Sequence, residues 1–286
     1  MATMICIISG LFWALFDLSR KLSLNHVSPK SILIYFNIIQ SVIFFIWVIY
    51  ENFSINFLPY LFPGITLIIL GVFSAIFFLK AIRDSELSLT IPLLSFTPFF
   101  STIFSYIILD EKLTLTQYIG ITSIIVGTLT LYSKNLQPTS ILMSIKTIRN
   151  NLSARLMFIV AIAWSITPVL DKICLKHSSI NMHGLVQSIG MIFFLVILSK
   201  NQIIKFKEIK KKTIALVTLT VIIGTIATIL QFYAILLNYV PIMEAVKRSI
   251  GQFCAILFGN IFFKEKITSQ RILGIILLSF GVLFIF

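Results

Sequence analysis

Ten apolar runs, each about 20 residues long, occupy almost the whole sequence. Lipid offers no water to backbone N–H and C=O groups, so a crossing segment must close these hydrogen bonds within itself, as a helix of about 20 residues does. The sequence therefore predicts an all-α integral membrane protein with ten transmembrane helices. The runs lie near residues 3–22, 31–50, 58–80, 87–109, 115–133, 156–175, 181–199, 213–237, 241–262 and 268–286.

The composition agrees with a membrane protein and argues against several other classes. Of the 286 residues, 58% are hydrophobic and 12% are charged, whereas about a quarter are charged in a typical soluble domain. The net charge of +13 is spread over short loops, which is what membrane orientation demands, so we expect no nucleic-acid partner. Cys6, Cys174 and Cys254 lie in apolar runs without ligand spacing. They predict no disulfide framework and no metal site.

The sequence is internally repeated, because residues 95–132 recur as residues 249–286. The two stretches share eleven identities in thirty-eight positions at an offset of 154. Shared hydrophobicity alone does not explain the match, because several identical pairs are not apolar. These pairs are Ser95/Ser249, Glu111/Glu265, Lys112/Lys266, Thr114/Thr268, Gly120/Gly274 and Gly127/Gly281. Each copy reads as an apolar helix, a tight charged turn and a second apolar helix.

The starts of the two halves also correspond, at an offset of 151, with matches that include Trp13/Trp164 and Lys21/Lys172. We therefore predict two five-helix repeats, at 1–133 and 155–286. Because five is an odd number, the second copy must enter the membrane in the opposite orientation. The linker 134–154 has apolar residues at helical spacing, which favours a helix lying on the membrane surface; a disordered connector fits it equally well.

Lysine and arginine are unevenly divided between the two sides of the predicted membrane. Eighteen follow the odd-numbered apolar runs, whereas three, Lys112, Lys172 and Lys176, follow the even-numbered ones. Positively charged loops stay in the cytoplasm. The bias therefore predicts a multi-pass protein of the cell inner (plasma) membrane with both termini outside.

No enzyme motif is present. The sequence contains no G-x-S-x-G, no H-E-x-x-H, no paired cysteines and no phosphate-cradling glycine loop. The histidines, His26, His177 and His183, fall at or near predicted helix ends. The repeat equivalents His26 and His177 are interpreted as interfacial residues. We predict neither enzymatic activity nor a cofactor.

Charged residues within the apolar run 241–262 are the strongest functional signal, because an ionised group at the bilayer centre costs several kcal/mol unless it faces a cavity or a partner. Glu244 precedes Lys247 by three residues and Arg248 by four, which places all three on one helical face. Their net positive charge favours a carboxylate or phosphate, with Arg248 as a bidentate clamp and Lys247 as a point charge. The alternative is that both cations snorkel to the interface or tie helices together.

The first apolar run holds Trp13 and, one turn later, Asp17. Asp17 could bind a substrate amine or a coupling proton, and Trp13 could form a wall of a cavity. The alternative is an Asp17–Arg20 ion pair, with the tryptophan as filler or interface anchor.

Polar residues at mid-helix are candidate cavity donors, although each alone is more often a helix–helix contact. They are Asn37, Gln40, Gln187, Gln231, Tyr233 and Gln252; we assign Asn37, Gln231, Tyr233 and Gln252 to the substrate site.

Glycines seven residues apart mark the fifth and the tenth apolar runs. Gly120 and Gly127 lie in one, and Gly274 and Gly281 in the other. Spaced by two turns, each pair makes one smooth helix face, which favours close packing within the fold or across a homodimer.

Two segments resemble the EamA-type members of the drug/metabolite transporter superfamily. One is Ala81–Pro98 followed by Leu109-Asp-Glu-Lys-Leu-Thr and the Gly120…Gly127 helix; the other is Phe232–Arg248 followed by Phe263-Lys-Glu-Lys and the Gly274…Gly281 helix. The resemblance implies a secondary transporter with a central cavity built by both halves, helices five and ten at the periphery, and alternating access. The family carries amino acids, other metabolites, nucleotide sugars and phosphates or drugs, and many members are placed with both termini inside, opposite to the charge bias here.

We therefore expect a permease or exporter of a small metabolite with a carboxylate or phosphate group, working by alternating access through a central cavity between the repeats. Its expected partners are this small-molecule substrate, the lipid bilayer and a second copy bound through helices five and ten. The alternatives are a membrane scaffold or sensor without transport, and a membrane-embedded enzyme acting on lipid. The sequence leaves the substrate and the choice between proton coupling and exchange open.

Overall fold

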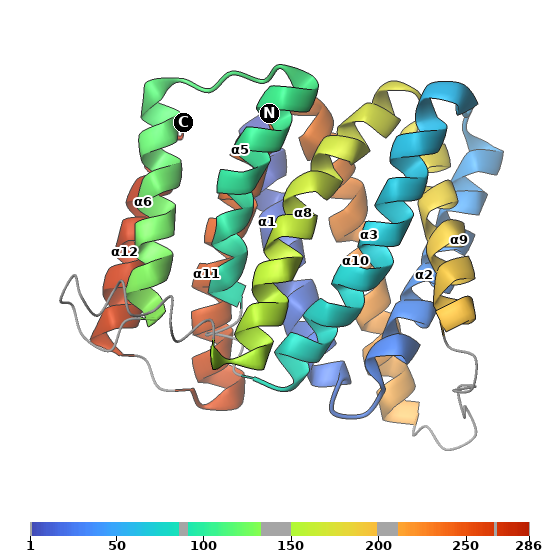
Figure 1. The fold of residues 1–286 in the computed structure, drawn as a ribbon. Coiled ribbons are helices and arrows are strands. Elements are labelled where there is room, and N and C mark those ends of the chain that lie inside the picture. The colour runs from blue at the N-terminus through green and yellow to red at the C-terminus, as the bar shows by residue number, and fades with distance from the viewer. Residues whose placement is uncertain (1, 86–90, 133–149, 199–210, 266–267, 286) are drawn as a thin grey trace.

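The computed structural model describes residues 2–85, 91–132, 150–198, 211–265 and 268–285, which form a bundle of helices (Figure 1). No strand forms among these residues, and Ile55 and Ser178 make an isolated bridge. The helices are α1 (Ala2–Ser23), α2 (Pro29–Tyr50), α3 (Phe57–Arg83), the 3₁₀ turn η1 (Ile91–Ser95), α5 (Phe96–Leu109), α6 (Leu115–Tyr132), α8 (Leu152–Lys176), α9 (Ile180–Leu198), α10 (Lys211–Leu237), α11 (Val240–Phe263) and α12 (Ser269–Leu283).

Each predicted apolar run overlaps a helix, and in the fourth run η1 and α5 cover residues 91–109. Within the described residues, six helices are long and apolar enough to cross a membrane: α1, α2, α3, α8, α9 and α10. Parts of α5, α6 and α12 count as shorter apolar helices. The described residues are therefore helical, and their apolar helices suit a membrane. The predicted surface helix of the linker falls on residues outside those that the structure describes.

The main helix contacts between the two halves have equivalent contacts in which the two helices come from the opposite halves. Helix α1 packs against α10 and α11, while its counterpart α8 packs against α3 and α5. Three pairs join equivalent helices across the halves: α2 with α9, α5 with α11 and α6 with α12. In Figure 1, α1 descends from the N-terminus whereas α8 ascends, and α6 descends whereas α12 ascends to the C-terminus. Both ends of the chain thus lie at one end of the bundle, as two copies of opposite direction require.

The glycine faces of α6 and α12 pack against each other within one chain. A Cβ atom added to Gly120 would lie 2.6 Å from the carbonyl oxygen of Gly281, and one added to Gly127 would lie 2.9 Å from that of Gly274. The hydroxyl of Ser123 donates to the Leu277 carbonyl across the same contact (3.1 Å). The glycine faces therefore bring two backbones into direct contact, as small residues do in membranes. A homodimer through these helices stays a prediction.

We expect Gly120→Ala to lower the free energy of unfolding by about 1–3 kcal/mol, because its methyl group would meet backbone atoms that cannot move aside alone. Thermal unfolding in detergent measures the effect. The matched control is Gly251→Ala on α11, since no atom lies within 4 Å of a Cβ added there. Equal stability of the two variants would contradict the close α6–α12 packing.

The predicted charged turn is a helix C-cap in both copies. Asp110 follows α5 and Lys264 follows α11, and both adopt left-handed backbone angles (φ 54° and 56°). The next residue in each copy returns its backbone N–H to a carbonyl six residues earlier, at 3.3 Å for Glu111 and 3.0 Å for Glu265, a common way to end a helix. Both glutamate side chains are buried. The two turns lie at opposite ends of the bundle (Figure 1).

The Glu111 carboxylate ties the first half to the second. One oxygen accepts from Lys172 Nζ (2.6 Å) and the other from the backbone N–H of Val240 (2.8 Å), at the start of α11. A carboxylate at a helix N-terminus satisfies a backbone donor and faces the positive end of the helix dipole. Lys172 Nζ also donates to the Asn238 carbonyl (2.7 Å). One buried ion pair therefore fixes the α5–α6 turn on α8 and α11.

We expect Glu111→Gln to lower the free energy of unfolding by about 3 kcal/mol, because it leaves the Lys172 ammonium buried without its counter-charge. Lys112→Gln is the matched control, since the Lys112 side chain is 67% exposed where it pairs with Asp110 and exposed pairs contribute little. Denaturant titration of both variants in detergent checks the difference. A Glu111→Gln protein as stable as the control would show that the pair does not hold the halves together.

Candidate functional site

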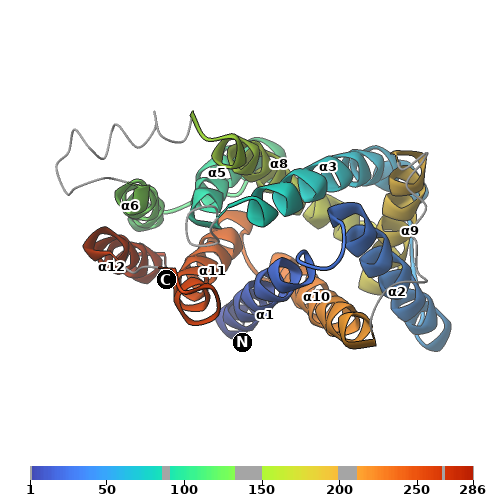
Figure 2. The same ribbon diagram turned by 90° about the horizontal axis from the view of Figure 1, so that it is seen from below.

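A cavity lies between the two halves. Its lining comes from α1, α2 and α3 on one side and α8, α9, α10 and α11 on the other. Figure 2 shows these helices as a ring, with α6 and α12 outside it, as the family resemblance implies. The cavity volume is about 190 Å³, which holds about six water molecules. A small metabolite fits this space.

A buried charged cluster from α11 forms part of the wall. The Glu244 side chain is fully buried, and its carboxylate accepts hydrogen bonds from Lys247 Nζ and from Arg248 Nε (3.0 Å). Lys247 Nζ also donates to the Gln231 side-chain oxygen on α10 (2.9 Å). One carboxylate thus neutralises one of two adjacent cations. The cluster keeps a net positive charge inside the bundle.

Two tryptophans flank these cations, one from each repeat. Lys247 Nζ lies 5.6 Å from the ring centroid of Trp13 on α1, and Arg248 Cζ lies 5.2 Å from that of Trp164 on α8. The Trp164 indole N–H donates to the Ser74 hydroxyl on α3 (2.9 Å), which fixes its ring. A ring face attracts a desolvated cation by about 2 kcal/mol. The tryptophans therefore hold the cations at the cavity wall.

A second buried ion pair joins Asp17 and Arg20 on α1. Arg20 lines the cavity, and its guanidinium carbon lies 4.1 Å from the Phe16 ring centroid and 4.4 Å from that of Phe78. Asp17 is not in the lining, although it accepts a hydrogen bond from Arg20. The cavity therefore meets the cation of this pair rather than its carboxylate.

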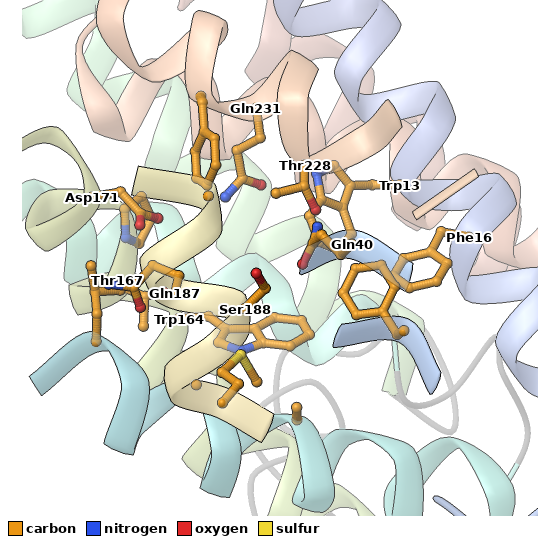
Figure 3. A pocket seen from close by; sticks show the side chains of 18 of the residues that line it. Trp13, Phe16, Gln40, Trp164, Thr167, Asp171, Gln187, Ser188, Thr228 and Gln231 are labelled. Atoms are coloured by element: carbon orange, nitrogen blue, oxygen red, sulfur yellow. The ribbon is translucent and has the colours of Figure 1, made fainter. Parts of the chain in front are cut away.

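Three buried N–H donors in the lining lack a hydrogen-bond partner within the described parts of the chain. They are Trp13 Nε1, Arg20 Nε and Gln40 Nε2. Figure 3 shows Trp13 and Gln40 near each other at one side of the cavity. Buried donors in folded proteins nearly always have an acceptor, from the protein, from water or from a ligand. This wall is therefore equipped to bind an acceptor that enters the cavity.

On the opposite side of the cavity, Asp171 begins a hydrogen-bonded chain that runs away from it. His183 Nε2 lies 3.1 Å from Asp171 Oδ1, and His183 Nδ1 lies 2.8 Å from the Tyr60 hydroxyl. The Gln187 amide donates to the same hydroxyl (3.2 Å). Asp171 and Gln187 line the cavity (Figure 3), whereas His183 and Tyr60 are buried behind them.

The family assignment rests on a family model that matches each half of the chain separately. The model of the EamA-like transporter family matches residues 1–133 and residues 152–286. The chain belongs to the EamA-like transporter family. Its members are transporters rather than enzymes, so this multi-pass membrane protein is a transporter of the drug/metabolite type, as the sequence predicts. A comparison with curated proteins finds no match.

Solved structures share the fold of this EamA-like protein. One of them, described only as a crystal structure of a protein, is 14% identical, covers 99% of this chain and 96% of its own, and has a TM-score of 0.67. This likeness supports the arrangement of the helices over their full length. At that level of identity it shows the fold alone.

Five of the nine site residues predicted for this EamA-like protein line the cavity: Trp13, Gln231, Glu244, Lys247 and Arg248. The other four lie elsewhere. Asp17 stands behind Arg20, Asn37 donates to the Leu33 carbonyl of its own helix (2.7 Å), and Gln252 is buried outside the lining. Tyr233 is 40% exposed on the outside of the bundle.

Other lining residues were not assigned to the site from the sequence: Gln40, Trp164, Asp171, Gln187, Ser188 and Thr228. Trp164 could have been found, because it is the repeat equivalent of Trp13. Ser188 and Thr228 carry no signal, since each hydroxyl bonds a carbonyl of its own helix, at 3.0 Å and 2.9 Å, as these residues do in apolar helices generally.

Proposed function

We propose that this EamA-like protein is a secondary transporter that carries a small anionic metabolite, bearing a carboxylate or phosphate, through the central cavity by alternating access. The observation that supports this most is the cavity wall itself. It combines the positive Glu244–Lys247–Arg248 cluster with buried N–H donors that have no acceptor in the described residues. In a low-dielectric site such donors attract an anion far more strongly than they would in water.

The Arg248 guanidinium is the group best suited to bind the anion. Its Nε and one terminal nitrogen contact the Glu244 carboxylate, at 3.0 Å and 2.9 Å, and a guanidinium has five N–H donors in all. An arriving carboxylate or phosphate can therefore accept from the remaining donors while Glu244 stays in place. Lys247 adds a point charge one residue away. The aromatic side chains Trp13, Phe16 and Trp164 suit an apolar portion of the solute.

All ten helices span the membrane in this proposal, as two inverted repeats at 1–133 and 155–286 joined by a linker at 134–154. The equivalence of the helix contacts in the two repeats provides the basis for alternating access. A contact that closes one end of the cavity has an equivalent at the other end. Glu111 and Lys172 form an ion pair at one end of the bundle. Their repeat equivalents in the sequence are Glu265 and Lys21. Exchanging these arrangements would expose the cavity to the opposite side.

Counterflow in proteoliposomes tests transport. Vesicles are loaded with one unlabelled solute from a panel of phosphate, lactate, pyruvate and glutamate, and uptake of the labelled solute is followed. We expect transient accumulation of at least one of these, and none of labelled choline, a cationic control. Folded, incorporated protein that gives no counterflow with any panel member would overturn the proposal.

A reporter that is active only in the cytoplasm tests the orientation. The loop charges place the segment between α9 and α10 in the cytoplasm and both termini outside. We expect activity from a fusion within residues 200–212 and silence from a fusion at Phe286. The reverse pattern would show that the termini lie inside, and it would leave the fold and the cavity unchanged.

A further inference from the structure

We propose that Asp171, His183 and Tyr60 form a proton-binding site through which one proton moves together with each singly charged anion. This inference rests on the proposed transport function and adds its driving ion. His183 lies on α9 with a fully buried side chain, held between a carboxylate and a phenol (3.1 Å and 2.8 Å). Histidine is the side chain whose ordinary charge change falls between pH 5 and 8. Because its side chain is buried, His183 does not anchor the chain at the membrane interface.

The hydrogen bonds define the resting state of this site. With His183 neutral, Nε2–H donates to Asp171, the Tyr60 hydroxyl donates to Nδ1, and Gln187 donates to the Tyr60 oxygen. Every group then has a hydrogen-bond partner. When His183 takes up a proton, Nδ1 becomes a donor, and the Tyr60 hydroxyl must turn its own proton elsewhere. One proton therefore reverses the direction of a bond that reaches from α9 to α3.

The site communicates with the cavity through one carboxylate. Asp171 lies in the cavity lining, whereas His183 and Tyr60 do not. Asp171 is therefore the group of this site that a proton entering from the cavity meets first. The other elements around His183 contribute buried neutral groups: the Phe232 ring of α10 lies 4.8 Å from the imidazole, Phe44 of α2 packs against the adjoining Gly184, and Cys174 of α8 lies in the same apolar cluster as Tyr60.

Charge balance couples the proton to the anion. The charged groups in or directly behind the cavity wall are three acids, Asp17, Asp171 and Glu244, and three bases, Arg20, Lys247 and Arg248. With His183 neutral their charges sum to zero. A bound anion with one negative charge would leave this buried region negative, which is costly in a medium of low dielectric constant. A proton on His183 restores neutrality, so the loaded and the empty carrier can both change conformation without net charge.

The test separates exchange from net transport of the panel solute with the strongest counterflow. Counterflow at equal pH needs no net proton movement, whereas accumulation driven by a pH gradient does. We expect wild-type protein to accumulate the solute about tenfold for one pH unit, the equilibrium for one proton per monovalent anion. His183→Gln can keep both hydrogen bonds but cannot take up a proton. It should keep binding the solute but lose the accumulation, and its counterflow should slow because the loaded carrier keeps a net negative charge, while the exposed control His26→Gln behaves as wild type.

Tyr60→Phe supplies a second variant in case His183→Gln does not fold. It removes the donor that favours neutral His183, so half-maximal accumulation should move to higher pH, whereas a merely structural role would lower uptake equally at every pH.

Accumulation by His183→Gln, or counterflow without accumulation by wild-type protein, would overturn the proton site and leave the transport function unaffected. Absence of any counterflow by wild-type protein would instead refute the transport function. An imidazole NMR signal of His183 that never titrates between about pH 5 and 9 would then also exclude the proton site.

Discussion

Arg248→Ala is expected to weaken the binding of the transported anion about a hundredfold. Two charge-assisted hydrogen bonds to a buried guanidinium contribute roughly 3 kcal/mol, and each 1.4 kcal/mol corresponds to a factor of ten. Removing Arg248 leaves Glu244 paired with Lys247, so the cluster becomes neutral and its attraction for an anion falls further. The measurement is the solute concentration that gives half-maximal counterflow, using the panel solute that wild-type protein carries best.

The controls for this variant distinguish anion binding from loss of structure. Arg155→Ala changes an exposed arginine in the first turn of α8 and should leave the half-maximal concentration unchanged. Arg248→Lys keeps the charge but loses the planar guanidinium, and we expect an intermediate loss of about tenfold. An Arg248→Ala protein that is folded and binds the solute as tightly as wild type would remove Arg248 from the site.

The second large effect is expected from Glu244→Gln, as a loss of about 3–5 kcal/mol in the free energy of unfolding. The substitution leaves Lys247 and Arg248 as two adjacent buried cations without a counter-charge, and breaking a buried ion pair from one side has this cost. Glu51→Gln is the matched control, because Glu51 is exposed at the end of α2, where it accepts from the Trp47 indole. Thermal unfolding of purified protein in detergent measures both.

A double variant shows whether charge is the cause. Glu244→Gln combined with Lys247→Met leaves one buried cation instead of two, so it should recover a large part of the lost stability. Lys247→Met alone keeps the Glu244–Arg248 pair and should be close to wild type in stability. If Glu244→Gln is as stable as the surface control, the cations are solvated at the interface rather than buried beside the cavity.

The helices could be predicted from the sequence because each is bounded by a clear local signal. Apolar runs of about 20 residues end at charged or capping residues, such as Ser28 before α2 and the left-handed Asp110 after α5. The duplication further specified which helices correspond, and with an odd number per half it fixed their relative direction. The 3₁₀ turn η1 at the start of the fourth run was not predicted, because a run of apolar residues does not distinguish helix types.

The prediction of lining residues was most secure where the residue type itself is costly in lipid. Glu244, Lys247 and Arg248 were found because charges within an apolar helix need a partner or a cavity. Single polar residues gave no such constraint: Asn37 bonds its own helix, whereas Gln40, less than one turn further, lines the cavity. Helices that are apolar on all sides hide which face points inward, and this also explains why Tyr233 was assigned to the site although it faces outward.

Most contacts between distant helices could not be predicted from the sequence, apart from the packing of the glycine faces of α6 and α12. His183 was given no role from its place near a helix start, yet α8 and α3 bring Asp171 and Tyr60 to its two ring nitrogens. Nothing in the spacing of these three residues indicates that they meet. The same holds for Lys172, which was counted as a loop charge at the end of the sixth apolar run but is buried against Glu111.

The most direct test of transport through the cavity between the two repeats measures whether the cavity can be reached from both sides of the membrane. Ser188 is buried in the lining on α9, and Ser188→Cys can be made in a background without the buried Cys6, Cys174 and Cys254. A membrane-impermeant thiol reagent should label this cysteine when added to either side of oriented vesicles, and the transported anion should slow labelling from both. Labelling from one side only, or from neither, would contradict a cavity that opens alternately.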